Sequence, residues 1–156
     1  MPRFKRILAL LVVLVLCVGF DQVTKSIAQR TLSGMPAQTL AAGLLRLEYT
    51  ENPGAFLSLG AKLSDDARFW IFTVMVAALL IGLLVFVFRM SPNTPFLIIL
   101  AIALVVGGGL SNLIDRLLNE GRVIDFMQLG IGPLRTGVFN VADVAIMGGL
   151  AVMLLV

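Results

Sequence analysis

Two long uncharged stretches limit what this sequence can fold into. Residues 69–88 are twenty positions without a charge, and residues 96–114 are nineteen. Each is long enough to cross a bilayer, because a membrane-spanning helix takes about 20 apolar residues. Two further apolar stretches, about 7–28 and 138–156, hold only a few polar residues. We therefore predict four membrane-spanning helices in a single membrane-embedded domain over residues 1–156.

The composition agrees with this class and excludes much chemistry. Hydrophobic residues make up 59% of the chain and charged residues 13%, against about 45–50% and about 25% in soluble domains. The sequence contains no histidine, which excludes a Ser-His-Asp triad, a Cys-His pair and a His-ligated zinc or haem. An enzyme built from this chain would use carboxylates, lysine or hydroxyls, and we expect no metal or cofactor.

The N-terminus resembles a secretory signal peptide, because Arg3, Lys5 and Arg6 precede the first apolar stretch. No A-x-A-like cleavage site follows. Leu16 precedes the single cysteine, Cys17, where a lipoprotein-type site needs a small residue. We therefore predict an uncleaved first span. The net charge of +3 provides no basic stripe for nucleic acid.

Basic residues predict the orientation. The N-terminal tail and residues 89–95 hold four basic residues and no acid in thirteen positions. The two other connections mix basic and acidic residues over a greater length. Because short cytoplasmic loops are rich in Lys and Arg, we expect both termini in the cytoplasm and the two longer connections on the outer side.

The first outer connection has a strand pattern. Leu45, Leu47 and Tyr49 alternate with polar residues, which is typical of a strand with one apolar face. Residues 52–54, Asn-Pro-Gly, mark a turn. We predict a small sheet resting on the bilayer surface, with an irregular lid as the alternative. Asp65 and Asp66 are predicted to cap the second span.

Charged residues inside spans are functional candidates, because each costs roughly 2.5 kcal/mol or more in the bilayer. Asp21 and Lys25 lie four positions apart and can form an ion pair on one helix face. This pair is either structural or chemically active. Asp143 has no basic residue in its own helix and lies about a turn and a half from the outer end. Asn140 lies three positions earlier on the same face.

Asp143 needs a partner or a proton to be tolerated. Asp125 is the better partner, because its neighbours in sequence are apolar. Asp115 is predicted to pair with Arg116 or to cap its helix. Two carboxylates that share one proton are the minimum for acid–base hydrolysis, because the ionised one activates water and the neutral one donates a proton.

The third span has features of a close-packed helix near these carboxylates. Gly107, Gly108 and Gly109 allow a neighbouring helix or an extended peptide to approach closely. Close packing alone would also explain them. Asn112 and Asn140 place amides at one membrane depth on two spans, where they can orient carboxylates or hold a substrate backbone.

Five short segments, in order, resemble those of the lipoprotein signal peptidases (signal peptidase II). Each lies at the outer end of a span or in an outer connection. They are Asp21-Gln22-Val23-Thr24-Lys25, Asn52-Pro53-Gly54-Ala55, Asn112-Leu113-Ile114-Asp115-Arg116, Val123-Ile124-Asp125-Phe126 and Phe139-Asn140-Val141-Ala142-Asp143.

This resemblance implies a four-span aspartyl endopeptidase of the bacterial inner membrane, with its site near the outer face. Its substrate would be a diacylglyceryl-modified prolipoprotein, cleaved N-terminal to the lipidated cysteine. Asp125 and Asp143 would be the catalytic dyad, and Asp21 and Lys25 would support the fold. The residues implied to line the substrate site are Asn52, Gly54, Asn112, Arg116 and Asn140.

The resemblance also implies an all-α membrane fold with a small outer β subdomain and a lid between the first two spans. We expect contacts with the lipid-modified precursor and with membrane phospholipid, and a monomeric state. This sequence departs from the family pattern at Phe56, in the expected lid, and at Ser111, where glycine is usual.

Two other functions remain open from the residues alone. One is a Ser-Lys peptidase, which would use Lys25 or Lys62 with one of the nearby serines, Ser26, Ser58 or Ser64. The other is a small transporter or lipid-binding scaffold, in which Asp143 would be a proton or cation site.

Overall fold

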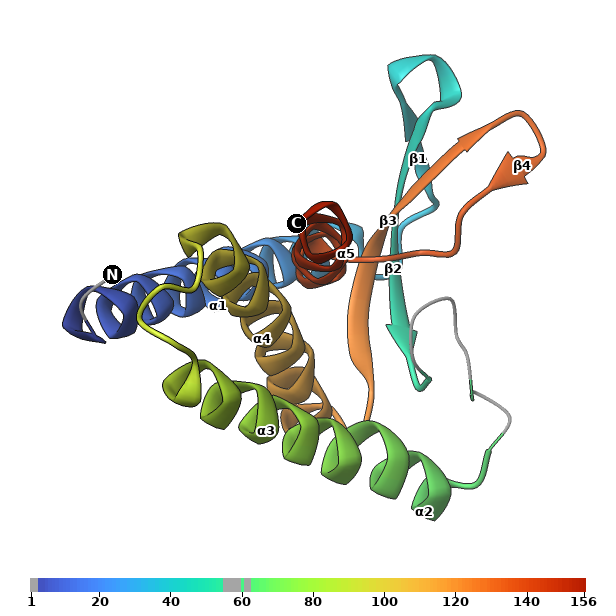
Figure 1. Cartoon of the computed structure of the whole chain (residues 1–156). Helices are drawn as coiled ribbons and strands as arrows, with labels where there is room; N and C mark the ends of the chain where they lie inside the picture. Colours follow the sequence, from blue (N-terminus) through green and yellow to red (C-terminus); the bar gives the residue numbers. More distant parts are fainter. Residues whose placement is uncertain (1–2, 55–59, 61–62) are drawn as a thin grey trace.

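The computed structural model describes residues 3–54, 60 and 63–156. Figure 1 shows long helices with a small sheet at the end of the molecule away from the N-terminus. The helical elements are α1 (Arg3–Leu32), η1 (Ala41–Gly43), α2 (Asp65–Arg68), η3 (Phe69–Met75), α3 (Val76–Arg89), α4 (Phe96–Leu118) and α5 (Val141–Leu155). The strands are β1 (Gln38–Leu40), β2 (Leu45–Asn52), β3 (Val123–Ile131) and β4 (Leu134–Arg135).

Three helices are long and apolar enough to cross a membrane: Arg3–Leu32, Asp65–Arg89 and Phe96–Leu118. The second is continuous through α2, η3 and α3. These helices confirm three of the four predicted spans, although each extends beyond its predicted bounds. The predicted span 138–156 is helical only over Val141–Leu155. At about 1.5 Å per residue, α5 is about 22 Å long, which is less than the roughly 30 Å hydrocarbon core.

Close contacts fix the directions of the helices. A methyl group added to Gly108 of α4 would meet the Ala142 carbonyl oxygen of α5, and one added to Gly149 of α5 would meet the Ala101 carbonyl oxygen of α4. The two helices are therefore antiparallel and touch backbone to backbone, as small residues allow in a bilayer. Gly107 of α4 lies against the side chain of Cys17 of α1.

Arg6 joins the start of α1 to the end of α3, at the end of the molecule that lies away from the sheet. It donates from Nη1 to the Met90 carbonyl oxygen at 2.8 Å and from Nη2 to the Ser91 carbonyl oxygen at 2.7 Å. A guanidinium at the C-terminus of α3 also complements the helix dipole. The start of α1 and the connection between α3 and α4 therefore lie together.

Apolar side chains form one core among the helices and a second beneath the sheet. The first holds Leu10, Val87, Ile99, Ile102, Ala103 and Val106. In the second, Ala28 and Leu32 of α1 pack against Phe126 of β3.

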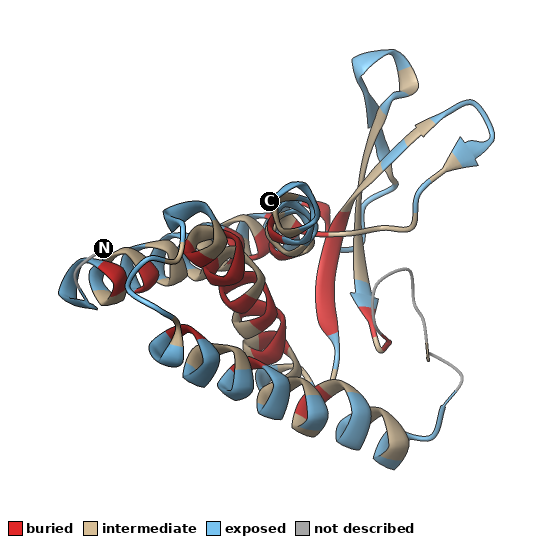
Figure 2. Ribbon diagram, in the orientation of Figure 1, coloured by how far each residue is buried: buried red, intermediate tan, exposed pale blue. Residues whose placement is uncertain are grey.

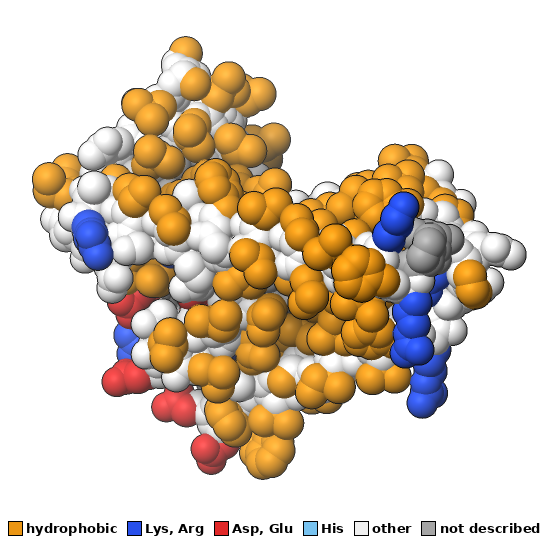
Figure 3. Space-filling model, turned by 90° about the vertical axis from the view of Figure 1, so that its left-hand side faces the viewer, with side chains coloured by type: hydrophobic (Ala, Val, Ile, Leu, Met, Phe, Trp, Pro, Cys, Tyr) orange, Lys and Arg blue, Asp and Glu red, His pale blue; other side chains and the backbone are white. Residues whose placement is uncertain are grey.

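Figure 2 shows that buried residues concentrate in α4 and the first half of β3. Figure 3 shows an outer surface that is largely apolar, with charged side chains at its margins, as expected for contact with lipid.

The sheet has four antiparallel strands in the order β1-β2-β3-β4. The strand predicted around Leu45, Leu47 and Tyr49 is confirmed as β2. The prediction that the β subdomain lies between the first two spans was incomplete, because β3 and β4 come from the connection between α4 and α5. The register between β2 and β3 shifts between Leu47 and Thr50, and Thr50 lies opposite Asp125.

The helix that begins at α2 has a different cap from the one predicted. Ser64 is the N-cap residue, and its side chain accepts a hydrogen bond from the Ala67 backbone N–H. Asp65 and Asp66 lie one step later, in the first turn, where their charges favour the helix dipole. The prediction that they cap the helix was wrong by one residue. The lid predicted around Phe56 falls largely outside the described residues.

Candidate active site

Asp125 lies in the buried part of β3, with only 2% of its surface exposed. Its Oδ2 accepts a hydrogen bond of 2.9 Å from Asn52 Nδ2, and its Oδ1 accepts one of 2.7 Å from Asn140 Nδ2. Burial raises the pKa of Asp125 to about 7, and the nearby charge of Asp143 acts in the same direction. The hydrogen bond from Asn52 opposes this shift. Asp125 is therefore able to hold a proton near neutral pH.

Asp143 lies in the first turn of α5, closer to the helix start than predicted. It forms a capping box with Asn140: the Asp143 N–H donates to Asn140 Oδ1 at 2.9 Å, and the Asn140 N–H donates to Asp143 Oδ2 at 3.2 Å. Asn112 Nδ2 donates to Asp143 Oδ1 at 3.0 Å. Backbone and amide donors at a helix N-terminus favour an ionised carboxylate and so oppose the effect of its partial burial.

Asn140 joins the two carboxylates. Its side-chain amide donates to Asp125 and its backbone N–H donates to Asp143. The same amide also donates to Asn112 Oδ1 at 3.1 Å. One residue therefore sets the relative placement of both acids, and the predicted amide pair, Asn112 and Asn140, contacts both of them.

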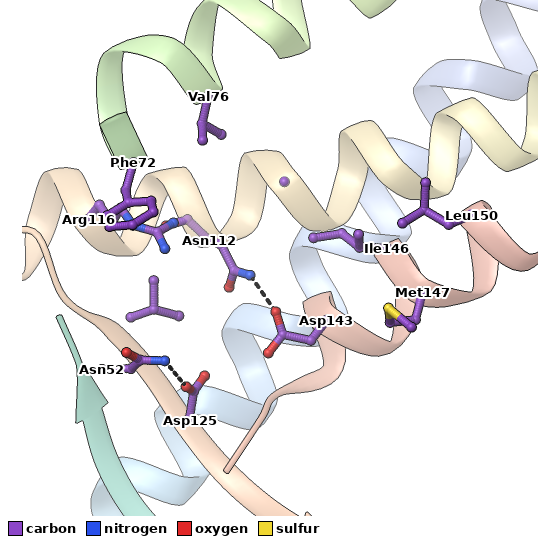
Figure 4. Close-up of a pocket in the computed structure, with 12 residues that line it drawn as sticks. Asn52, Phe72, Val76, Asn112, Arg116, Asp125, Asp143, Ile146, Met147 and Leu150 are labelled. Carbon is purple, nitrogen blue, oxygen red and sulfur yellow. Dashed lines mark hydrogen bonds between the residues drawn. The ribbon is translucent and has the colours of Figure 1, made fainter. Parts of the chain in front are cut away.

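Both carboxylates line one cavity of about 310 Å³ (Figure 4). Polar residues gather at one end of it: Asn52, Asn112, Arg116, Asp125 and Asp143. The remaining wall is mostly apolar and includes Phe72, Val76, Ile146, Met147 and Leu150. A carboxylate pair beside an apolar cavity suits a substrate whose side chains near the reacting bond are apolar.

Arg116 closes the polar end. Its Nη2 donates to the Gly54 carbonyl oxygen at 3.0 Å, and its guanidinium lies 5.9 Å from the centre of the Phe72 ring. The Gly54 N–H donates to Asn52 Oδ1 at 2.9 Å, which forms the predicted turn. The structure therefore brings all seven predicted dyad and substrate-site residues together.

The residues predicted to be structural form a second buried cluster. Lys25 Nζ lies 2.6 Å from Asp21 Oδ2, 2.8 Å from Asp115 Oδ2 and 2.8 Å from Asn112 Oδ1. The predicted Asp21–Lys25 pair is confirmed. The predicted partner of Asp115 was wrong, because Asp115 binds Lys25 and the Ile124 N–H rather than Arg116. Lys25 thus has one acceptor for each of its three protons, which argues against its use as the base of a Ser-Lys peptidase.

Two residues of this second cluster were not predicted to contribute. Gln22 Nε2 donates to Asp115 Oδ1 at 2.7 Å and to Ser111 Oγ at 3.0 Å. Ser111, noted only as a departure from the family pattern, donates to Asp21 Oδ2 at 2.7 Å. A polar side chain within an apolar helix was the available signal for both. Phe72, which faces Arg116, carried no such signal.

A family model described as signal peptidase (SPase) II matches residues 13–156. The chain belongs to the signal peptidase II family. This confirms the resemblance that the five motifs indicated, and the match extends from the first helix to the last.

Individual relatives agree with the signal peptidase II assignment. A lipoprotein signal peptidase of Leifsonia xyli subsp. xyli is 38% identical over 95% of this chain and 66% of that protein, so the chain spans just under two thirds of its length. The lipoprotein signal peptidase of Geobacter sulfurreducens is 35% identical over 85% of this chain and 81% of that protein.

Solved structures agree as well. A bacterial membrane enzyme superimposes with a TM-score of 0.77 at 29% identity, covering 94% of this chain and 85% of that one. A second structure of a bacterial membrane enzyme gives the same TM-score and identity, and this chain covers 90% of it. The fold described above is therefore similar to that of a bacterial membrane enzyme.

Proposed function

We propose that this protein is a membrane-embedded aspartyl endopeptidase that removes signal peptides from diacylglyceryl-modified prolipoproteins. The observation that carries the proposal is the pair of carboxylates, Asp125 and Asp143, joined through Asn140 at the polar end of one cavity. Membership of the signal peptidase II family supports the substrate class. The proposed cleavage site is the peptide bond N-terminal to the lipidated cysteine.

The two carboxylates have different surroundings, which supports different starting protonation states. Asp125 lies on a strand, accepts hydrogen bonds from two neutral amides and has a pKa of about 7. Asp143 lies at the N-terminus of α5 and accepts a backbone N–H. Asp125 therefore begins as the neutral acid and Asp143 as the carboxylate that activates water.

The reaction then balances without a cofactor. Asp143 takes a proton from water as the water oxygen attacks the scissile carbonyl carbon, and Asp125 gives its proton to the carbonyl oxygen. A neutral gem-diol results. Asp125 recovers a proton from one hydroxyl while Asp143 donates its own to the leaving nitrogen. The C–N bond breaks, and the dyad returns to its starting state with one proton.

The remaining polar groups support substrate positioning. Arg116 lines the cavity, and its buried Nε has no hydrogen-bond partner within the described residues. It is suited to donate a hydrogen bond to a carbonyl oxygen of an extended substrate backbone. The apolar wall is suited to the side chains of a signal peptide, and its volume matches a short extended segment rather than a folded domain.

We propose that the enzyme resides in the bacterial inner membrane with both ends of the chain in the cytoplasm. The basic tail and residues 89–95 support this orientation by the positive-inside rule, and Arg6 binds that connection. The dyad lies at the opposite end of α1 and α4 and would face the outer leaflet. As part of this arrangement, we propose that α5 is the fourth span.

Single Asp125→Asn and Asp143→Asn variants test the mechanism. Each should lower kcat on a lipidated precursor by about 10³-fold or more, because each removes one partner of the proton exchange. Cleavage is measured with purified enzyme in lipid vesicles, and folding is checked by thermal unfolding. Asp65→Asn, which removes an exposed carboxylate of α2, is the matched control. Normal turnover by either dyad variant would exclude the proposed mechanism.

A further inference from the structure

Five side chains, four of them buried and one half-buried, close into a ring beside the dyad. Ser111 donates to Asp21, Gln22 donates to Ser111 and to Asp115, and Lys25 bridges Asp115 and Asp21. The contacts range from 2.6 to 3.0 Å. We call these residues (Asp21, Gln22, Lys25, Ser111 and Asp115) the polar ring. Its members come from α1 and α4 alone.

The polar ring reaches the backbone next to each dyad carboxylate. Asp21 Oδ1 accepts the Ala142 N–H at 2.7 Å, immediately before Asp143. Asp115 Oδ2 accepts the Ile124 N–H at 3.1 Å, immediately before Asp125. Each acid of the ring therefore holds the segment that carries one acid of the dyad.

A third contact reaches the dyad through a side chain. Lys25 donates to Asn112 Oδ1 at 2.8 Å, which turns the Asn112 amide so that its Nδ2 faces Asp143 Oδ1 at 3.0 Å. An amide rotated by half a turn would present oxygen to the carboxylate and lose both bonds. Lys25 therefore selects the orientation of Asn112 that favours an ionised Asp143.

Ser111 completes the ring in this chain. It is fully buried, and its hydroxyl both donates to Asp21 and accepts from Gln22. Without that hydroxyl, Asp21 Oδ2 would keep Lys25 as a partner but lose the donor on its other side. The carboxylate would then be free to rotate away from the Ala142 N–H.

We propose that the polar ring positions the catalytic dyad, with Asp21 fixing Asp143, Asp115 fixing Asp125, and the Ser111 hydroxyl holding Asp21 in the orientation that contacts α5. None of these three residues lines the cavity that holds the dyad, so they are positioning residues. The proposal rests on the proposed peptidase function for its kinetic consequences and on the hydrogen bonds described above for its structural ones. A displacement of about 1 Å at a reacting group costs about 10²-fold in rate.

The first test is kinetic and uses Ser111→Ala, which removes one oxygen and adds no bulk. We expect kcat per folded enzyme to fall about tenfold with KM unchanged, because the substrate site itself is intact. Asp115→Asn should lower kcat by about 10²-fold. Thr31→Ala, which removes an exposed hydroxyl from α1 whose hydrogen bond goes to the Ile27 carbonyl, is the control and should match the parent enzyme.

A double variant tests whether Ser111 acts through Asp21. The Asp21→Asn, Ser111→Ala pair should be no slower than Asp21→Asn alone, because both changes release the same contact. Additive losses would show that Ser111 acts elsewhere and would overturn its assigned role. A raised KM at unchanged kcat in Ser111→Ala would overturn it as well.

The second test needs no activity. Amide hydrogen exchange of the purified protein should accelerate at Ala142 in Asp21→Asn and in Ser111→Ala, and at Ile124 in Asp115→Asn, each by about tenfold or more. Uniform acceleration, or lower thermal stability with kcat per folded enzyme unchanged, would reduce the ring to a general structural role. If the dyad variants are active while these exchange effects appear, the peptidase mechanism fails and the positioning contacts stand.

Discussion

Two pairs of acids lie side by side at one end of this protein, all buried except the half-buried Asp143, and the two pairs differ in the groups that contact them. In the polar ring, Asp21 and Asp115 share the charge of Lys25 at 2.6 and 2.8 Å. In the dyad, Asp125 and Asp143 accept hydrogen bonds from amides and backbone N–H groups and line an open cavity. Acids paired with a cation are held in place by it, whereas an acid that faces neutral donors can hold a proton. The same residue type thus holds two helices together in one place and forms the proposed reactive pair in the other.

The largest expected effect comes from removing the cation of the polar ring. Lys25→Met leaves two buried carboxylates without their cation and should lower the free energy of unfolding by about 3–5 kcal/mol. Thermal and denaturant unfolding in detergent measure this. The exposed Arg122–Glu51 pair provides the control, since Arg122→Met should cost about 1 kcal/mol or less. Similar losses in the free energy of unfolding for the two variants would contradict the idea that the buried ion pairs of the polar ring contribute more than a surface pair.

The next prediction concerns the dyad and pH. The folded-state pKa of Asp125, about 7, lies above its ordinary value of 3.8. Between these values the unfolded chain binds fewer protons than the folded one, so Asp125 lowers stability as pH rises from about 4 to 7, by a few kcal/mol. Asp125→Asn should remove this part of the pH dependence of Tm. An unchanged Tm difference between pH 4 and pH 8 would contradict the raised pKa.

A smaller effect tests the helix contact that joins the two groups. Gly108→Ala places a methyl group against the Ala142 carbonyl oxygen and should push α5 away from α4, weakening both the Asp21–Ala142 and Asn112–Asp143 bonds. We expect a loss of about 1–3 kcal/mol in stability together with reduced kcat. Gly148→Ala in α5, whose added methyl would meet nothing within 4 Å, should be neutral. Equal behaviour of the two would mean that the close approach is unimportant.

The smallest effect is a shift in a pH profile. Asn52 donates to Asp125 Oδ2 and thereby lowers the pKa of Asp125. Asn52→Ala should raise that pKa and move the alkaline limit of kcat/KM to higher pH, by less than about one unit. The expected parent profile falls as pH rises through about 7, because Asp125 must be protonated. A shift of the limit to lower pH would contradict Asp125 as the acid.

The sequence predicted the parts of the site that follow from single residues. An acid in an apolar span needs a partner, and this argument selected Asp125 for Asp143. It failed for Asp115, because the neighbouring Arg116 lies about 100° around the helix, while the true partner, Lys25, is on another helix. Pairing between helices depends on packing, which one sequence does not contain.

In the fold, too, features that follow from the local sequence were predicted and features that depend on packing were not. β2 was predicted from its alternation of apolar and polar residues. β3 was missed because Val123, Ile124 and Phe126 are all buried with Asp125, and a strand covered on both faces shows no alternation. The start of α2 was misplaced because Asp65 and Asp66 share the cap preferences of Ser64, and only backbone geometry separates them.

The pairing of β2 with β3 also sets the order in which parts of this protein can fold during synthesis. The bond between Asn52 and Asp125 spans 73 positions, and the helices α2, η3, α3 and α4 all lie between the two strands in the sequence. Residues of β2 therefore leave the ribosome long before their partners exist, and long-range pairing of this kind is slow. The carboxylate pair forms only once α5 packs against Gly108, so the proposed active site stays incomplete until synthesis has passed Asp143.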